Sequence, residues 1–109
     1  MATSVIPIQT HQWNTMLGPL VVGGTTVQIP NFSSLTEDKV VVIYLHRYSY
    51  GVSLVIPVKV IRNGDIAGGS TLYLQDTTKY YTVGVSASGV ISLISNHGDG
   101  NPYVAIVVV

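Results

Sequence analysis

Charged side chains are scarce in this chain of 109 residues. Five basic and five acidic residues make up 9% of the sequence, against about 25% in an ordinary soluble domain. The formal net charge is zero, so there is no basic field to attract nucleic acid or an anionic membrane surface. Because charge is also depleted where subunits meet, we expect a homo-oligomer. The alternative is a monomer coated with serine, threonine, asparagine and glycine.

Cysteine is absent, which excludes disulfides and thiolate metal sites. Long apolar runs are absent too, since the longest, Val104–Val109, is far too short to span a bilayer. The first residues, Met1–Ser4, lack the charged and apolar regions of a signal peptide. The sequence therefore predicts no membrane insertion and no secretory signal.

Helical periodicity is missing, and the pattern that is present favours strands. The stretch Val40–Leu45 is aliphatic at every position except Tyr44, and most of its residues are β-branched. Successive side chains of a strand point to opposite faces, so this strand is apolar on both. We expect a second sheet to cover one face and a further sheet or another subunit to cover the other.

The rest of the chain predicts a single domain over residues 1–109, with residues 1–24 as its least regular part. The fold expected is all-β, an antiparallel, jelly-roll-like β-sandwich of about eight short strands. A strand from Val52 to Ile61 returns beside the central one, and Pro57 places it at a sheet edge or a bulge. Residues 32–39 are expected to contain one helical or 3₁₀ turn, capped by Ser33 or Ser34.

Two further strand signals close the sequence. The clearest hairpin joins Tyr80–Ser86 to Val90–Ile94 through a turn at residues 87–89. A polar loop then leads to the aliphatic run at the C-terminal end. Such a run is prone to aggregate at an open sheet edge, so we expect this last strand to be central or covered by a neighbouring chain.

Residues that carry chemistry form no recognisable catalytic or metal pattern. The three histidines, His11, His46 and His97, are not spaced as a local metal-binding pair. No nucleophile elbow accompanies the serines, and the glycine pairs lack the helix and lysine of a phosphate loop. The loop Asn96–Asn101 offers oxygen donors, but not the spaced acids of a calcium loop. We therefore predict that the protein is not an enzyme and has no metal and no cofactor.

Aromatic residues gather at one predicted turn and give the best binding signal. Tyrosine offers a saccharide an apolar ring face and a polar edge, and neighbouring polar groups can pair with sugar hydroxyls. The polar loop before the last strand is the second element expected at this end. The candidate ligand-binding residues are Arg47, Tyr48, Tyr50, Asn96, Asp99 and Asn101. The alternative interpretation is that these tyrosines are ordinary, half-buried strand residues.

The order of features resembles the small β-sandwich domains of tailed-bacteriophage tail fibres and receptor-binding proteins. The likeness rests on Gly24–Phe32 (GTTVQIPNF), a short polar gap and the hydrophobic strand Lys39–Tyr44, and it covers residues 13–109 loosely. It implies a homotrimer attached to a virion at the phage tail, with contacts to other virion proteins and to a host-surface glycan. The His-x-His iron site of some phage spike tips is missing, and no binding residue can be transferred by motif.

Three functional hypotheses follow from the sequence. The first is a non-enzymatic phage virion component of the tail-fibre type that binds host-surface saccharide. The second is a capsid decoration protein or another purely structural virion protein, which would have the same need for an interface but no ligand. The third is a free carbohydrate-binding module, for which a monomer with an exposed aromatic platform is expected.

Overall fold

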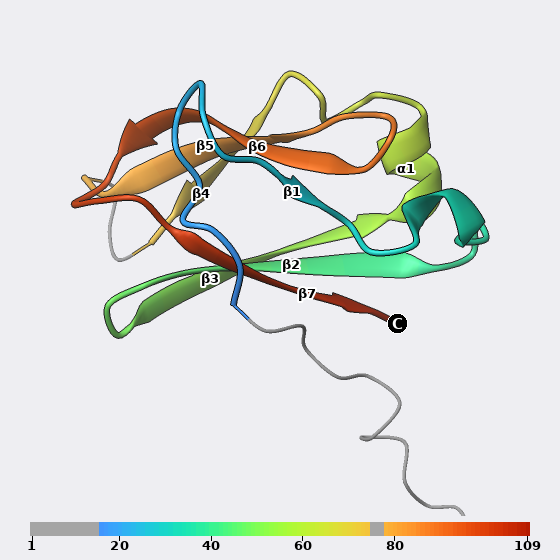
Figure 1. Ribbon diagram of the computed structural model, residues 1–109, viewed down its shortest axis with the longest axis horizontal. Helices are drawn as coiled ribbons and strands as arrows, with labels where there is room; N and C mark the ends of the chain where they lie inside the picture. Colours follow the sequence, from blue (N-terminus) through green and yellow to red (C-terminus); the bar gives the residue numbers. More distant parts are fainter. Residues whose placement is uncertain (1–15, 75–77) are drawn as a thin grey trace, which may run out of the picture.

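The computed structural model describes residues 16–74 and 78–109 and consists of two antiparallel β-sheets packed face to face (Figure 1). The four-stranded sheet has the order β1 (Val27–Gln28), β6 (Val90–His97), β5 (Tyr80–Val85), β4 (Ser70–Tyr73). The three-stranded sheet has the order β3 (Tyr50–Pro57), β2 (Val40–Arg47), β7 (Tyr103–Val108). The predicted antiparallel β-sandwich is confirmed, with seven strands in the described residues where about eight were expected.

The core lies between the two sheets and is built from alternate residues of each strand. The completely buried inward residues are Val41, Ile43, Leu45, Val104 and Ile106 of the three-stranded sheet and Tyr81, Val83, Val85 and Ile91 of the four-stranded sheet. Burial of each aliphatic side chain of this size contributes about 1.5–3 kcal/mol. The rows of inward aliphatic side chains are therefore what brings the two sheets together.

The strand β2 occupies the centre of its sheet, as its sequence predicts. Val42 pairs with Val55 of β3 on one side and with Val107 of β7 on the other. β3 is the edge strand and ends at Pro57, which confirms the position expected for a residue without a backbone N–H. The inner face of β2 is covered by the other sheet, whereas the outer residues Val42 and Tyr44 remain half-buried.

The prediction that this strand continues to Ile61 is wrong, because residues Val58–Arg62 form the short helix α1. Val40 and Pro57 form the last named pair of the β2–β3 ladder. The N–H of Val58 instead donates to the carbonyl of Lys39 at 2.9 Å. Val58 and Ile61, three residues apart on the helix, both reach the core and are fully buried.

The expected short turn before β2 is the 3₁₀ turn η2 (Phe32–Ser34). Its N-cap is Asn31 at φ 55°, without a side-chain cap bond, so the prediction of a serine cap is wrong. Arg62 holds η2 against α1, since its Nη2 donates to the Phe32 carbonyl at 2.9 Å and its guanidinium lies 5.2 Å from the Phe32 ring centre.

The first described residues run along the three-stranded sheet. Leu17 exchanges two backbone hydrogen bonds with Val104, at 2.7 and 2.8 Å, beside the outer edge of β7. β7 is thus the last named strand of its sheet and has a bridge on its far side, whereas a central position was one of two expectations. Among the described residues no helix is long and apolar enough to cross a membrane. Predictions for residues 1–15, including any role for His11, fall outside the described ranges.

The hairpin β5–β6 is confirmed and is longer than predicted. Its second strand runs to His97, so Asn96 and His97 belong to a strand, not to the polar loop. The pairing shifts by one residue between Thr82 and Val83, which is a β-bulge on β6. This bulge decides which residues of β6 face outward beyond it.

Candidate functional site

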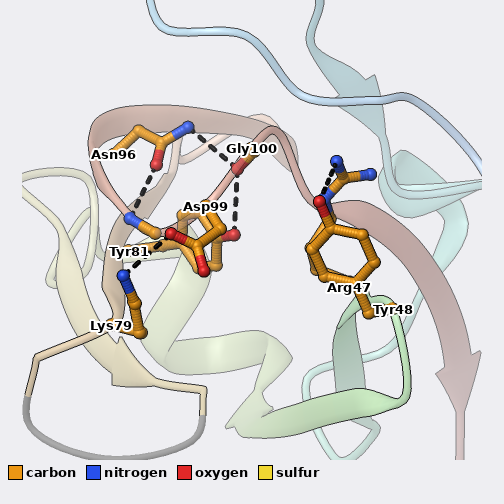
Figure 2. A network of polar contacts seen from close by, with 8 residues as sticks. Arg47, Tyr48, Lys79, Tyr81, Asn96, Asp99 and Gly100 are labelled. Atoms are coloured by element: carbon orange, nitrogen blue, oxygen red, sulfur yellow. Dashed lines mark hydrogen bonds and ion pairs between the residues drawn. The ribbon is translucent and has the colours of Figure 1, made fainter.

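The six candidate residues lie at one end of the sandwich, in two connections and in the strand ends that flank them. The β2–β3 turn and the β6–β7 connection meet there, at the left of Figure 1. Figure 2 shows that Arg47 and Tyr48 approach this end from the first connection and Asn96, Asp99 and Gly100 from the second. The sequence therefore predicted correctly which two loops lie together.

The β2–β3 turn is a two-residue hairpin turn at Tyr48 and Ser49. Tyr48 has φ 57°, as the mirror-image turns of tight hairpins require. The Arg47 guanidinium carbon lies 4.2 Å from the centre of the Tyr48 ring, and Arg47 Nη2 donates to the Tyr48 hydroxyl at 3.1 Å. One face of the Tyr48 ring is thus occupied, although the residue is 61% exposed.

Arg47 closes the end of the core. It continues the inward row of Val41, Ile43 and Leu45, so its side chain points toward the opposite sheet. A Cβ at Gly100 would lie 2.6 Å from Arg47 Nη2 and 2.7 Å from Nε, which means that the guanidinium packs directly on this glycine. Arg47 Nε is buried and has no hydrogen-bond partner within the described chain.

The β6–β7 connection is built over the hydroxyl of Tyr81. This hydroxyl donates to the carbonyl of Gly100 at 2.9 Å, and Asn96 Nδ2 donates to the same oxygen at 3.0 Å (Figure 2). Asn96 Nδ2 also donates to Asn101 Oδ1 at 3.0 Å, while Asn96 Oδ1 accepts from the N–H of Gly98 at 2.9 Å. The amide groups of Asn96 and Asn101 therefore hold the loop in shape.

Charged groups contribute little energy at this end of the sandwich. Asp99 and Lys79 form an ion pair at 2.8 Å, with side chains 61% and 39% exposed, so solvent screens most of its energy. Burial raises the pKa of the Tyr81 hydroxyl, and the positive charge of Arg47 offsets part of this effect. Tyr81 is therefore held in its neutral form, in which its hydroxyl is a donor.

The structure divides the six candidates by availability. Arg47, Asn96 and Asn101 are engaged around Gly100, whereas Tyr48, Tyr50 and Asp99 are exposed. Tyr81 and Gly100, which organise the loop, were not among the residues predicted from the sequence. The only sign of them there is the pair of closely spaced glycines, Gly98 and Gly100, in a polar loop. No group of three histidine, aspartate or glutamate residues that could hold a metal ion occurs in the described parts of the chain.

A second candidate surface is the outer face of the three-stranded sheet, which we call the apolar face. Its residues, from the strand registers, are Val40, Val42, Tyr44 and His46 of β2; Gly51, Ser53, Val55 and Pro57 of β3; and Tyr103, Ala105, Val107 and Val109 in or just after β7. Val55 is 61% exposed and Val109 44%, while Ala105 and Val107 near the middle are buried. The Tyr44 and His46 rings stack at 6.0 Å at one end of this face.

Comparison with protein-family models, with curated proteins and with solved structures found no match to this chain. The functional conclusion therefore depends on the two surfaces described above.

Proposed function

We propose that this protein is a non-enzymatic component of a larger assembly and packs against copies of itself through the apolar face. The observation that carries the proposal is the composition of that face. Across three strands it contains no lysine, arginine, aspartate or glutamate. Exposure of such a face to water is unfavourable, and covering it with a second apolar surface lowers the free energy.

The distribution of charge supports the same conclusion. The charged residues of the described chain lie in loops, in α1 and at the end of β2, and none lies on the apolar face. Interface cores are depleted of charge in the same way, while aromatic residues such as Tyr44 and Tyr103 are common in them. An assembly would also account for the low content of charged residues.

The sequence resemblance supports a more specific proposal. Domains of phage tail fibres assemble as homotrimers on a virion, and the loop end of this sandwich would then point outward to a host-surface saccharide. Tyr48, Tyr50 and Asp99 are the exposed candidates there. A purely structural virion protein is the second candidate, since it would use the same apolar face without any ligand.

Sedimentation velocity of the whole chain, from micromolar to near-millimolar concentration, tests the assembly. We expect a closed oligomer, with a trimer favoured, and we expect Val55→Glu to dissociate it because an unpaired charge would be buried in the interface. Val22→Glu is the matched control, because Val22 is a 48% exposed valine outside the apolar face. A wild-type protein that stays monomeric over this range would contradict the proposal and favour a free carbohydrate-binding module.

A further inference from the structure

Three rings form a row across the outer face of the four-stranded sheet. Tyr73 of β4 pairs with Tyr80 of β5, and Tyr80 pairs with His97 of β6. The Tyr73 and Tyr80 ring centres are 5.4 Å apart, and the Tyr80 and His97 rings stack at 4.5 Å with an interplanar angle of 21°. The bulge at Thr82/Val83 makes this possible, since a continuous register would place His97 on the inner side.

A row of hydroxyl groups lies beside the rings. Thr71 of β4 pairs with Thr82 of β5, and Thr82 pairs with Ser95 of β6. These residues are two positions along each strand from the rings, so they share the same face. We call the six residues the ring-and-hydroxyl grid: Thr71, Tyr73, Tyr80, Thr82, Ser95 and His97.

The grid is accessible, and its rings are held by contacts with one another before a ligand binds. Tyr73 is 52% exposed and lies on β4, the last strand of its sheet, so no strand within residues 16–74 and 78–109 lies on one side of its ring. Tyr80 stands behind it, and His97 behind Tyr80. A ligand that stacks on Tyr73 therefore meets a ring already held by its neighbours, which lowers the entropy cost of binding.

We propose that the ring-and-hydroxyl grid binds a neutral saccharide. The C–H face of a pyranose suits an aromatic ring with a polar edge, and serine and threonine hydroxyls can both donate to and accept from sugar hydroxyls. The grid contains no lysine, arginine, aspartate or glutamate, so it has no fixed charge to attract phosphates or acidic sugars. The nearest cation, Lys79, is already paired with Asp99.

This site goes beyond the assembly proposed above and does not depend on it. The six residues belong to the other sheet, and none of them is among the loop-end candidates. A variant made monomeric by Val55→Glu should therefore keep the binding of a single saccharide chain to a single protomer. Loss of assembly and loss of saccharide binding are then separate results.

An array of neutral oligosaccharides, probed with the whole chain, identifies the ligand, and NMR titration with the best hit measures its affinity. Tyr73→Ala should weaken binding about tenfold by removing the stacking ring. Thr71→Val, which keeps the shape and removes a hydroxyl, should weaken it about fivefold. The ring resonances of Tyr73 and Tyr80 should shift on binding in the wild-type protein.

Val22→Ala is the control, since Val22 is a 48% exposed residue outside the grid, the loop-end candidates and the apolar face. It should bind as the wild type does, and unchanged melting temperatures of all three variants would show that their folds are intact. The proposal is overturned if no neutral oligosaccharide binds. It is equally overturned if Tyr48→Ala abolishes binding while Tyr73→Ala and Thr71→Val leave it unchanged.

Discussion

The outer face of the three-stranded sheet presents valine, alanine and tyrosine, whereas the β4–β5–β6 part of the other sheet presents threonine, serine and aromatic rings. The inner faces of the two sheets are much alike, because both are rows of aliphatic residues at alternate positions. The inward positions specify the sandwich, and the outward positions are left to specify partners. One face suits an apolar protein surface and the other a hydroxylated ligand.

The two sheets also differ in what covers them from their own chain. On the four-stranded sheet the loop after α1 lies against Gly84 of β5, since a Cβ on this glycine would lie 2.8 Å from the backbone oxygen of Ala67. On the apolar face the corresponding close contact is a side chain, since a Cβ on Gly51 would meet the Tyr44 hydroxyl. Backbone cover is fixed, whereas a tyrosine ring can move aside for a partner.

The largest expected effect separates the two sides of β2. Val41→Ala should lower the free energy of unfolding by about 2–3 kcal/mol, because it opens a cavity at a fully buried site. Val42→Ala, at the next residue on the apolar face, should cost below about 1 kcal/mol in the monomer, since Val42 is half-buried there. Urea unfolding of both variants measures the difference.

Measuring the unfolding free energy of both variants at several protein concentrations tests whether copies of the protein cover the apolar face. If copies cover the apolar face, the cost of Val42→Ala should grow as concentration rises and the oligomer forms, while the cost of Val41→Ala should stay constant. Equal costs for the two valines at low concentration would mean that the apolar face is already as well packed as the core, and the contrast between the faces would fail.

Several elements of the fold can be predicted from local sequence patterns alone. β2, the edge position of β3 and the β5–β6 hairpin follow from β-branched runs, Pro57 and turn residues, all of which act within a few positions. The helix α1 was missed because Val58–Arg62 continues the alternation of β3. The β2–β3 ladder has its last named pair at Val40 and Pro57, and the alternation of residues in β3 does not mark that limit.

The candidate site could be predicted only in part, because some of its contacts join residues that are distant in sequence. The two loops were identified, but the packing of Arg47 on Gly100 joins residues far apart in sequence and depends on how the sheets stack. The ring row depends on a one-residue bulge at Thr82/Val83, which leaves no clear signature in the sequence. Without that register Tyr73 and Tyr80 would still pair, but His97 would face the inner side of the sheet.

A smaller effect compares glycines on the two outer faces. Gly84→Ala should lower the free energy of unfolding by about 1–3 kcal/mol, because a backbone oxygen and the side chain of Ile94 must both shift. Gly51→Ala should change it by below about 1 kcal/mol, since only the end of the Tyr44 ring must swing away. Thermal unfolding of the two variants compares them directly.

Gly51→Ala has a second consequence that sharpens the comparison. The displaced Tyr44 ring would stand out from the apolar face, so we expect weaker self-association than in the wild type, seen by sedimentation. Gly84→Ala should leave self-association unchanged in the folded protein. A reversed pattern, with Gly84→Ala dissociating the oligomer, would place the interface on the four-stranded sheet.

The last effect concerns the connection that joins the two sheets. Tyr81→Phe removes the hydroxyl that donates to the Gly100 carbonyl, but Asn96 still donates to that oxygen. Since the acceptor stays satisfied, the loss of unfolding free energy should be about 1 kcal/mol near neutral pH.

Burial raises the folded-state pKa of Tyr81 above its ordinary value of 10.0, so its contribution to stability is fully present below pH 10.0 and is lost as pH rises through the raised value. The difference in unfolding free energy between the wild type and Tyr81→Phe should therefore narrow above pH 10.0, as urea titrations at several alkaline pH values would measure. A constant difference across that range would mean that the hydroxyl ionises equally easily in both states, and the β6–β7 connection would then be no better shielded than an ordinary surface loop.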